Sequence, residues 1–158
     1  MAYDFPDIGY IEGSFCGPFS PEQVTKVERM AGVVVPKSFV QYCQSRNGGV
    51  PISASLKIGE DTTVIERFLC FISDYKSDPS DGLFDVGVVW SQIEDRLDEH
   101  LLPFAALFAG DYLCFDTGSE TGEAVVFWDH ERSQLDEPVT TPIAGTFTEF
   151  LGMLGQTA

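Results

Sequence analysis

The stretch Ser45-Arg46-Asn47-Gly48-Gly49-Val50-Pro51 marks a sharp joint in the chain. The residues before it have the apolar spacing of an amphipathic helix, and the residues after it alternate like a strand. Asn and Gly tolerate the left-handed backbone conformation that ends many helices, because Gly has no Cβ atom to clash. Pro51 then prevents the helix from resuming. The stretch therefore predicts a direct switch from helix to strand, which lets the helix dock beside the sheet that follows.

Two helices are predicted on the N-terminal side of this joint. The first begins after Ser20, where Pro21 suits the first turn and Gln23 completes a capping box, and it ends at Gly32. The second opens at Pro36. Its buried stripe consists of Phe39, Tyr42 and Cys43.

The same periodicities predict the rest of the chain. Strands are expected over residues 52–58, 62–72, 102–107, 112–116, 124–128 and 139–143. In the first of these strands, Ile52 and the apolar residues that alternate with it are expected to face inward. A helix capped by Asp85 is expected over residues 86–97, and a last helix follows the capping box of residues 146–149. This order is typical of an α+β fold with a mostly antiparallel sheet flanked by helices.

The length and the apolar stripes define one expected core. A chain of 158 residues is expected to form a single domain over residues 1–158. The core is predicted to contain Val24, Val27, Phe39, Trp90, Ile93, Phe104, Phe115 and Phe150.

The charge balance is the strongest signal in the composition. There are 25 acidic residues against 9 basic residues, which gives a net charge of -16. Such a chain repels phosphates, so neither nucleic acid nor an anionic membrane surface is expected as a partner. On one interpretation, the same negative field attracts a basic protein and speeds its approach. On the other, the charge only keeps the protein soluble. The composition leaves both interpretations open.

The N-terminus and the cysteines bear on the compartment. Residues 1–7 have no basic region and no long apolar run, so a signal peptide is not expected. No stretch is apolar enough to span a membrane, and we expect a cytoplasmic protein. Cys16, Cys43, Cys70 and Cys114 lie far apart in the sequence, so four reduced thiols are expected.

No pattern in the chain supports catalysis, and we expect no enzyme. The G-x-S-x-G nucleophile motif is absent, and the glycines of residues 13–17 have the wrong spacing for it. Each cysteine lies among apolar residues and is expected in the core rather than paired with a histidine. Carboxylate chemistry is the weakest of the hypotheses, because so many acids make any one pair uninformative.

Metal and cofactor binding are not expected either. His100 and His130 lie in charged stretches and are predicted to be solvated. Asp74, Asp78 and Asp81 precede a glycine, but their spacing does not match a calcium-binding loop. The phosphate-binding glycine motifs are absent, so no nucleotide is expected.

Several motifs together resemble the SUKH superfamily, which includes the yeast Smi/Knr cell-wall regulators and many bacterial immunity proteins. On the N-terminal side the resemblance rests on Val27-Glu28, Met30-Ala31-Gly32, Val35-Pro36 and Asn47-Gly48-Gly49. Further on it rests on residues 102–105, Gly110-Asp111, Phe115-Asp116, Gly122, residues 125–126 and 128–131, and residues 146–151. The motif-bearing region spans about residues 20–155. The chain departs from the family at residues 32–35, where the family usually has a leucine before the proline.

The resemblance implies an α+β fold and a function that requires no catalysis. Bacterial members mostly bind and neutralise a cognate toxin of a contact-dependent or polymorphic toxin system, such as a nuclease. The alternative is a regulatory interaction module of the same fold with a housekeeping partner. In either case the glycine joint has a structural role, which is to hold the two N-terminal helices against the sheet. The sequence does not determine the oligomeric state.

The expected partner is a cognate protein toxin with a basic surface, which would meet the densest acidic clusters of this chain. Trp128 is a further candidate, because buried aromatic residues dominate protein interfaces. Trp128 alternates with Phe127, and the pattern does not decide which of the two faces outward. The candidate partner-binding residues are Asp74, Asp78, Asp81, Glu94, Asp95, Asp98, Glu99, Asp111, Asp116 and Trp128.

Overall fold

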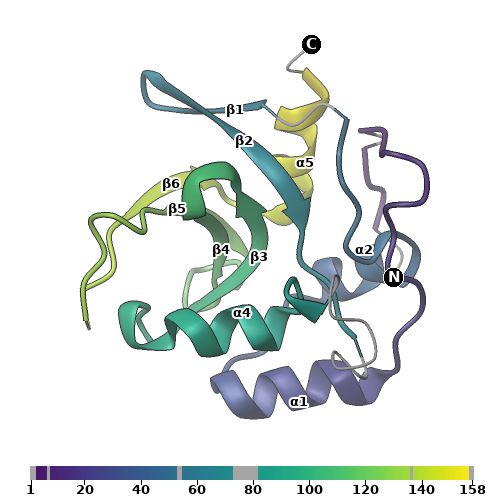
Figure 1. Cartoon of the computed structure of the whole chain (residues 1–158), viewed down its shortest axis with the longest axis horizontal. Coiled ribbons are helices and arrows are strands. Elements are labelled where there is room, and N and C mark those ends of the chain that lie inside the picture. Colours follow the sequence, from purple (N-terminus) through teal and green to yellow (C-terminus); the bar gives the residue numbers. More distant parts are fainter. Residues whose placement is uncertain (1–2, 7, 53–54, 73–81, 136, 157–158) are drawn as a thin grey trace.

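An antiparallel sheet lies at the centre of the molecule, with helices packed around it (Figure 1). The computed structural model describes residues 3–6, 8–52, 55–72, 82–135 and 137–156. The sheet has six strands in the order β1-β2-β3-β4-β5-β6, and each strand pairs antiparallel with the next. The strands are β1 (Ser55–Ile58), β2 (Asp61–Phe68), β3 (Leu101–Leu107), β4 (Tyr112–Asp116), β5 (Ala124–Trp128) and β6 (Thr140–Ala144). This arrangement confirms the predicted α+β fold.

The helices cover the sheet in two groups. α5 contacts β1, β5, β6 and α2, whereas α4 packs against β3 and is covered in turn by α1. The α-helices are α1 (Pro21–Ala31), α2 (Lys37–Arg46), α4 (Val86–Ile93) and α5 (Phe147–Gln156). Two short 3-10 helices, η1 (Glu94–Arg96) and η2 (Phe108–Gly110), precede β3 and β4. Within the described residues, no helix combines the length and apolar character needed to cross a membrane.

Local chemistry fixes the start and the end of α1 and the start of α4 where the sequence predicts them. The capping box between Ser20 and Gln23 begins α1, and Gly32 ends it with a φ of 72°. Asp85 caps α4 by accepting a hydrogen bond from the Val88 amide at 3.1 Å, and it also accepts one from the Ile72 amide at 2.9 Å. Burial raises the pKa of the Asp85 carboxyl above its ordinary value, and these hydrogen bonds offset part of that effect.

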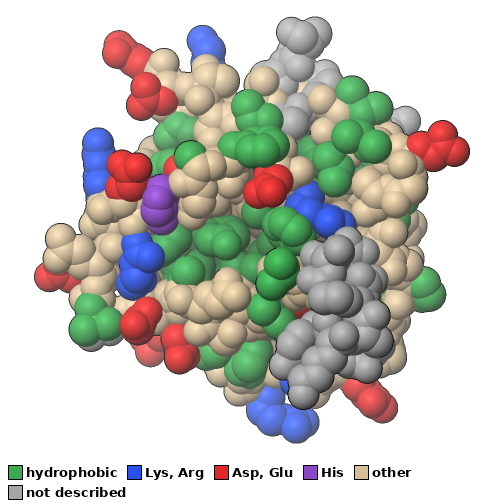
Figure 2. Space-filling view, viewed as in Figure 1, with side chains coloured by type: hydrophobic (Ala, Val, Ile, Leu, Met, Phe, Trp, Pro, Cys, Tyr) green, Lys and Arg blue, Asp and Glu red, His purple; other side chains and the backbone are tan. Residues whose placement is uncertain are grey.

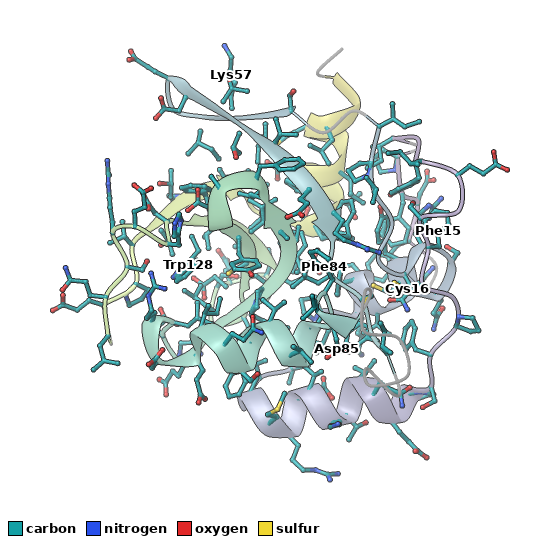
Figure 3. The ribbon with its side chains drawn as sticks, in the orientation of Figure 1. Phe15, Cys16, Lys57, Phe84, Asp85 and Trp128 are labelled. Carbon is teal, nitrogen blue, oxygen red and sulfur yellow. The ribbon has the colours of Figure 1, made fainter. Side chains whose placement is uncertain are left out.

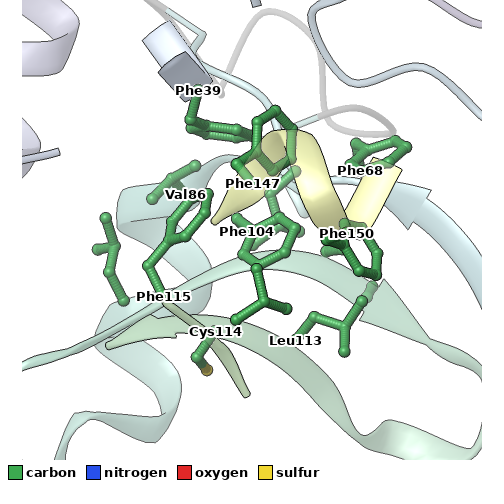
Figure 4. Packing of buried hydrophobic residues seen from close by; sticks show 14 of the residues in the cluster. Phe39, Phe68, Val86, Phe104, Leu113, Cys114, Phe115, Phe147 and Phe150 are labelled. Carbon is green, nitrogen blue, oxygen red and sulfur yellow. The ribbon is translucent and has the colours of Figure 1, made fainter. Parts of the chain in front are cut away.

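The core is rich in aromatic rings, as Figure 4 shows. Phe104 and Phe115 stack with their centroids 4.2 Å apart, and Phe147 meets both edge-on. Six residues of the predicted core are buried: Val27, Phe39, Ile93, Phe104, Phe115 and Phe150. Val24 and Trp90 are half-buried and pack against its outside.

The ends of three predicted elements were wrong. β1 begins at Ser55 rather than at Ile52, which is 67% exposed, because the chain still runs beside the N-terminal segment at this point and Ile52 donates to the Gly9 carbonyl. β2 ends at Phe68, because Cys70 leaves the sheet to bridge with Asp85. The helix predicted over residues 86–97 ends at Ile93 and tightens into η1.

The joint after α2, residues 47–49, connects three parts of the chain through hydrogen bonds and close packing. Gly48 has a φ of 72°, as predicted, whereas Asn47 has a φ of -59° and is buried. The Asn47 amide nitrogen donates to the carbonyls of Gly17 and Phe71, and its oxygen accepts from the Phe71 amide, all at 2.9 Å. A Cβ atom on Gly49 would lie 2.6 Å from the Phe15 ring. The joint therefore holds the N-terminal segment and the end of β2 as well as the helix.

Candidate partner-binding surface

A continuous acidic segment lies between α4 and β3. Glu94, Asp95, Asp98 and Glu99 are all exposed, and we call these four residues the acidic ridge. The two residues between its halves turn inward: Leu97 is buried and Arg96 is half-buried. The ridge therefore presents carboxylates on one side and anchors itself to the protein on the other.

Arg96, the one basic residue among residues 94–99, is engaged inside the protein. Its guanidinium carbon lies 5.0 Å from the centroid of the Trp128 ring. Its Nε atom donates to the Ser133 carbonyl at 3.1 Å, and its Nη2 atom donates to the His130 carbonyl. Because this cation points inward, it does not neutralise the exposed carboxylates beside it.

Trp128 supports the ridge from beneath and is not an exposed interface anchor. Its side chain is fully buried, so the outward orientation that the sequence left open is wrong. The indole Nε1 atom donates to the Arg96 carbonyl at 3.1 Å, and Figure 3 shows Trp128 beside the strands above α4. Trp128 faces inward because the segment that follows α4 covers this face of β5.

Asp111 links the start of β4 to the turn after β5 through hydrogen bonds to His130. One oxygen of its carboxylate accepts hydrogen bonds from the His130 amide at 2.9 Å and from His130 Nδ1 at 2.7 Å. The His130 side chain is 32% exposed, so the prediction of a solvated histidine was wrong for this residue. His100 is 54% exposed, as predicted. The Asp111–His130 pair ties the start of β4 to the turn after β5.

Asp116 lies at the other end of β4, beside the end of the acidic ridge. It pairs with Leu101 in the sheet, and the Thr117 amide donates to the His100 carbonyl at 2.8 Å. A strand the length of β4 separates its two end residues by about 13 Å. The structure therefore brings Asp116 to the Glu99 end of the ridge, whereas Asp111 lies at the opposite end of β4 and is linked to Arg96 through His130.

The predicted loop acids cannot be placed in the same way. Asp74, Asp78 and Asp81 lie outside the described residues.

Among the described residues, one group has side chains close enough to share a cation: Asp111, Asp129 and His130. Their ligand atoms lie within 4.8 Å of one another. The Asp111–His130 hydrogen bond accounts for one pair. Asp129 accepts from the amides of Glu131 at 3.0 Å and Arg132 at 3.2 Å, which closes the turn. These hydrogen bonds explain the geometry of the group without a metal ion.

Arg96 shapes this surface, and the sequence did not predict that role. A single arginine among acidic residues is typical of a surface ion pair. Nothing in the residues beside it in the sequence indicates that its side chain points inward. Its partners, the carbonyls of His130 and Ser133, are more than thirty residues away in the chain. Long-range backbone acceptors of this kind leave no pattern in the sequence.

The surface around the ridge combines charge with apolar area. In Figure 2, hydrophobic side chains gather across the middle of the face, over β3, β4 and α4, and most of the Asp and Glu side chains lie around the rim. An apolar centre with a polar rim is the usual anatomy of a protein interface. This face therefore has the composition of a protein-binding surface.

Comparison with known families agrees with this geometry. The SUKH_6 family, described as SMI1-KNR4 cell-wall, matches residues 21–151. The chain belongs to the SUKH superfamily. No curated protein matches the chain. SUKH proteins are associated with immunity functions, and the match confirms the resemblance seen in the motifs from the first helix to the last.

Proposed function

We propose that this SUKH protein is an immunity protein without catalytic activity, which binds a cognate protein toxin and blocks it. The observation that carries the proposal is the inward orientation of Arg96, which turns the one basic residue among residues 94–99 away from the exposed carboxylates of the acidic ridge. A toxin that acts on nucleic acid has a basic substrate groove, because it must hold phosphates. The ridge has the charge needed to cover such a groove.

The position of the ridge supports a role in binding rather than in folding. Glu94 and Asp95 follow the last residue of α4, whose dipole disfavours negative charge at that end, and they also form the first turn of the three-residue η1. Acids at a helix C-terminus do not stabilise the helix. A contact with a basic partner gives these carboxylates a function that the fold itself does not.

The apolar middle of the same face supplies the second component of binding. Rim charges act mainly on the rate of association, whereas desolvated apolar contacts hold the complex together. An acidic rim around an apolar centre therefore suits a partner that must be captured quickly and then held.

Growth rescue tests the proposal. A candidate cognate toxin domain is co-expressed with the wild type, with a Glu94→Lys/Asp95→Lys variant, or with a Glu60→Lys/Asp61→Lys control. The control changes the charge equally at exposed acids of the β1–β2 hairpin, away from the ridge. We expect the wild type and the control to restore growth and the ridge variant to do so poorly. Failure of the wild type to protect cells or to bind the toxin would contradict the proposal.

The family description favours a second candidate function, because it names cell-wall proteins. A regulatory interaction module would use the same surface on a housekeeping partner. The two candidates differ in phenotype. Deleting an immunity gene harms only cells that encounter the toxin, whereas deleting a regulator changes growth or envelope integrity without any toxin.

A further inference from the structure

Two cysteine side chains meet at the glycine joint. A Cβ atom on Gly48 would lie 2.6 Å from Cys16 Sγ and 2.8 Å from Cys70 Cβ. The missing side chain at position 48 is what allows these two cysteines to approach each other. Their thiols are joined by a hydrogen bond, although the residues are far apart in the sequence.

Cys16 has the surroundings of a reactive thiol. Its side chain is half-buried, and its Sγ atom lies 3.5 Å from the Nη2 atom of Arg67. The same guanidinium nitrogen donates to the carbonyls of Gly48 at 2.6 Å and Ser14 at 3.2 Å, which hold it in place. A fixed cation beside a sulfur favours the thiolate, which is the nucleophilic form.

A small cavity is lined by the two chain neighbours of Cys16. It has a volume of about 220 Å³, and its lining includes Phe15, Gly17 and Cys43. The first two flank Cys16 in the chain, as the place of Cys16 next to Phe15 in Figure 3 shows. A cavity of this size admits a molecule as small as hydrogen peroxide to the chain on either side of Cys16, and the cysteine in its lining is Cys43.

Cys70 has the complementary environment. It is fully buried, its amide donates to the Phe84 carbonyl at 2.9 Å, and its own carbonyl accepts from the Val86 amide at 2.8 Å. The hydrogen bond with the Cys16 thiol and burial both raise the pKa of Cys70. Cys70 is therefore held as a protonated thiol, in a fixed position beside Cys16.

We propose that Cys16 and Cys70 form a peroxide-sensitive dithiol site that is converted into an intrachain disulfide. In the first step the Cys16 thiolate attacks one oxygen of hydrogen peroxide. A sulfur–oxygen bond forms, the oxygen–oxygen bond breaks, and hydroxide leaves and takes up a proton as water. Cys16 is then a sulfenic acid.

In the second step the sulfur of Cys70 attacks the sulfur of the Cys16 sulfenic acid. The disulfide bond forms, the sulfur–oxygen bond breaks, and the hydroxyl group leaves as water with the proton of Cys70. Two thiols and one hydrogen peroxide thus give one disulfide and two waters. The new bond needs a sulfur–sulfur distance of about 2.05 Å, which hydrogen-bonded thiols reach by a small side-chain movement.

The product would cross-link the N-terminal segment to the chain between β2 and α4. The closed loop contains α1 and α2, so the cross-link restricts the unfolded chain over a long stretch. Oxidation is therefore expected to raise the midpoint of denaturation, and a reductant should reverse the effect.

The test is non-reducing peptide mapping of the folded protein after treatment with hydrogen peroxide. The wild type is expected to lose the mass of two hydrogen atoms and to yield a Cys16–Cys70 peptide. Cys114→Ser is the matched control, because Cys114 is a buried thiol in β4, away from the joint. It should form the same disulfide as the wild type. Cys70→Ser should stop at the sulfenic acid, which dimedone labels at Cys16.

A Cys43→Ser variant decides between the two possible partners of Cys16, because burial and the neighbouring Cys16 thiol also raise the pKa of Cys43. The proposal requires that Cys43→Ser still forms the Cys16–Cys70 disulfide. It is overturned if the mapped bond joins Cys16 to Cys43, or if the folded wild type shows neither a disulfide nor a sulfenic acid at Cys16. It is also overturned if Cys114 is oxidised as fast as Cys16. Circular dichroism of each variant establishes that the protein remains folded.

Discussion

The guanidinium carbon of Arg96 lies 5.0 Å from the centroid of the Trp128 ring, and the Trp128 indole nitrogen donates to the Arg96 carbonyl at 3.1 Å. The two residues therefore contact each other twice, once through the side chain of Arg96 and once through its backbone. The contact fixes the segment between α4 and β3 and withdraws its only cation. The exposed carboxylates of the acidic ridge follow from this pair.

Removing the Trp128 side chain should destabilise the whole protein. Trp128→Ala leaves a large cavity and an unpaired Arg96 carbonyl, and truncation of a buried tryptophan costs roughly 3–5 kcal/mol. Phe127→Ala, on the half-buried neighbour, should cost clearly less. Urea denaturation measures both free energies of unfolding. Similar values for the two variants would show that Trp128 does not support the ridge.

Gly48 and Gly32 form a matched pair for testing the joint, because both have a φ of 72°. An alanine at either position is expected to cost about 1–2 kcal/mol in the left-handed conformation. At Gly32 the new methyl group meets nothing within 4 Å, whereas at Gly48 it would overlap the side chains of Cys16 and Cys70. Gly48→Ala should therefore be the more destabilising variant in denaturant titrations. Equal midpoints would mean that the space at Gly48 is not restricted.

Asp85 should make stability depend on pH in a defined direction. Because its folded-state pKa is raised, the folded protein binds this proton more tightly than the unfolded chain does. Its contribution to stability is therefore fully present below the ordinary pKa and is lost as the pH rises through the raised folded value. Asp85→Asn removes this titration and keeps a cap oxygen.

The measurement for Asp85 is the difference in unfolding free energy between the wild type and Asp85→Asn across the acidic range. We expect the wild type to lose stability relative to the variant as the pH increases through that window. A difference that is constant, or that changes in the opposite direction, would show that the carboxylate is not penalised by burial.

Features that depend on local chemistry could be predicted from the sequence. The capping box at Ser20, the stop at Gly32 and the positive φ of Gly48 each follow from residues that are close in the chain. The prediction failed where an orientation depends on a distant segment. Trp128 faces inward because the segment after α4 covers it, and alternation within β5 cannot reveal which face is covered.

The candidate surface shows the same division. The acids of the ridge are visible in the sequence, but the inward turn of Arg96 depends on carbonyls in the loop after β5. Asn47 is a further example. The sequence predicts only that it ends a helix, but its buried side chain forms hydrogen bonds with both the amide and the carbonyl of Phe71. Polar contacts between side chains and a distant backbone are specific in space and leave no periodicity in the chain.

We expect the acidic ridge to steer a basic toxin toward this protein, and stopped-flow association kinetics with the cognate toxin are the measurement that tests this steering. Charges of this kind act over about 8 Å at physiological ionic strength, so the association rate must respond to salt. The wild-type rate constant should fall as salt is added. Glu94→Lys/Asp95→Lys should associate more slowly at low salt and show a weaker salt dependence, whereas Glu60→Lys/Asp61→Lys should stay close to the wild type. A wild-type rate that does not change with ionic strength, or an equal loss in the control, would show that the ridge does not steer the toxin.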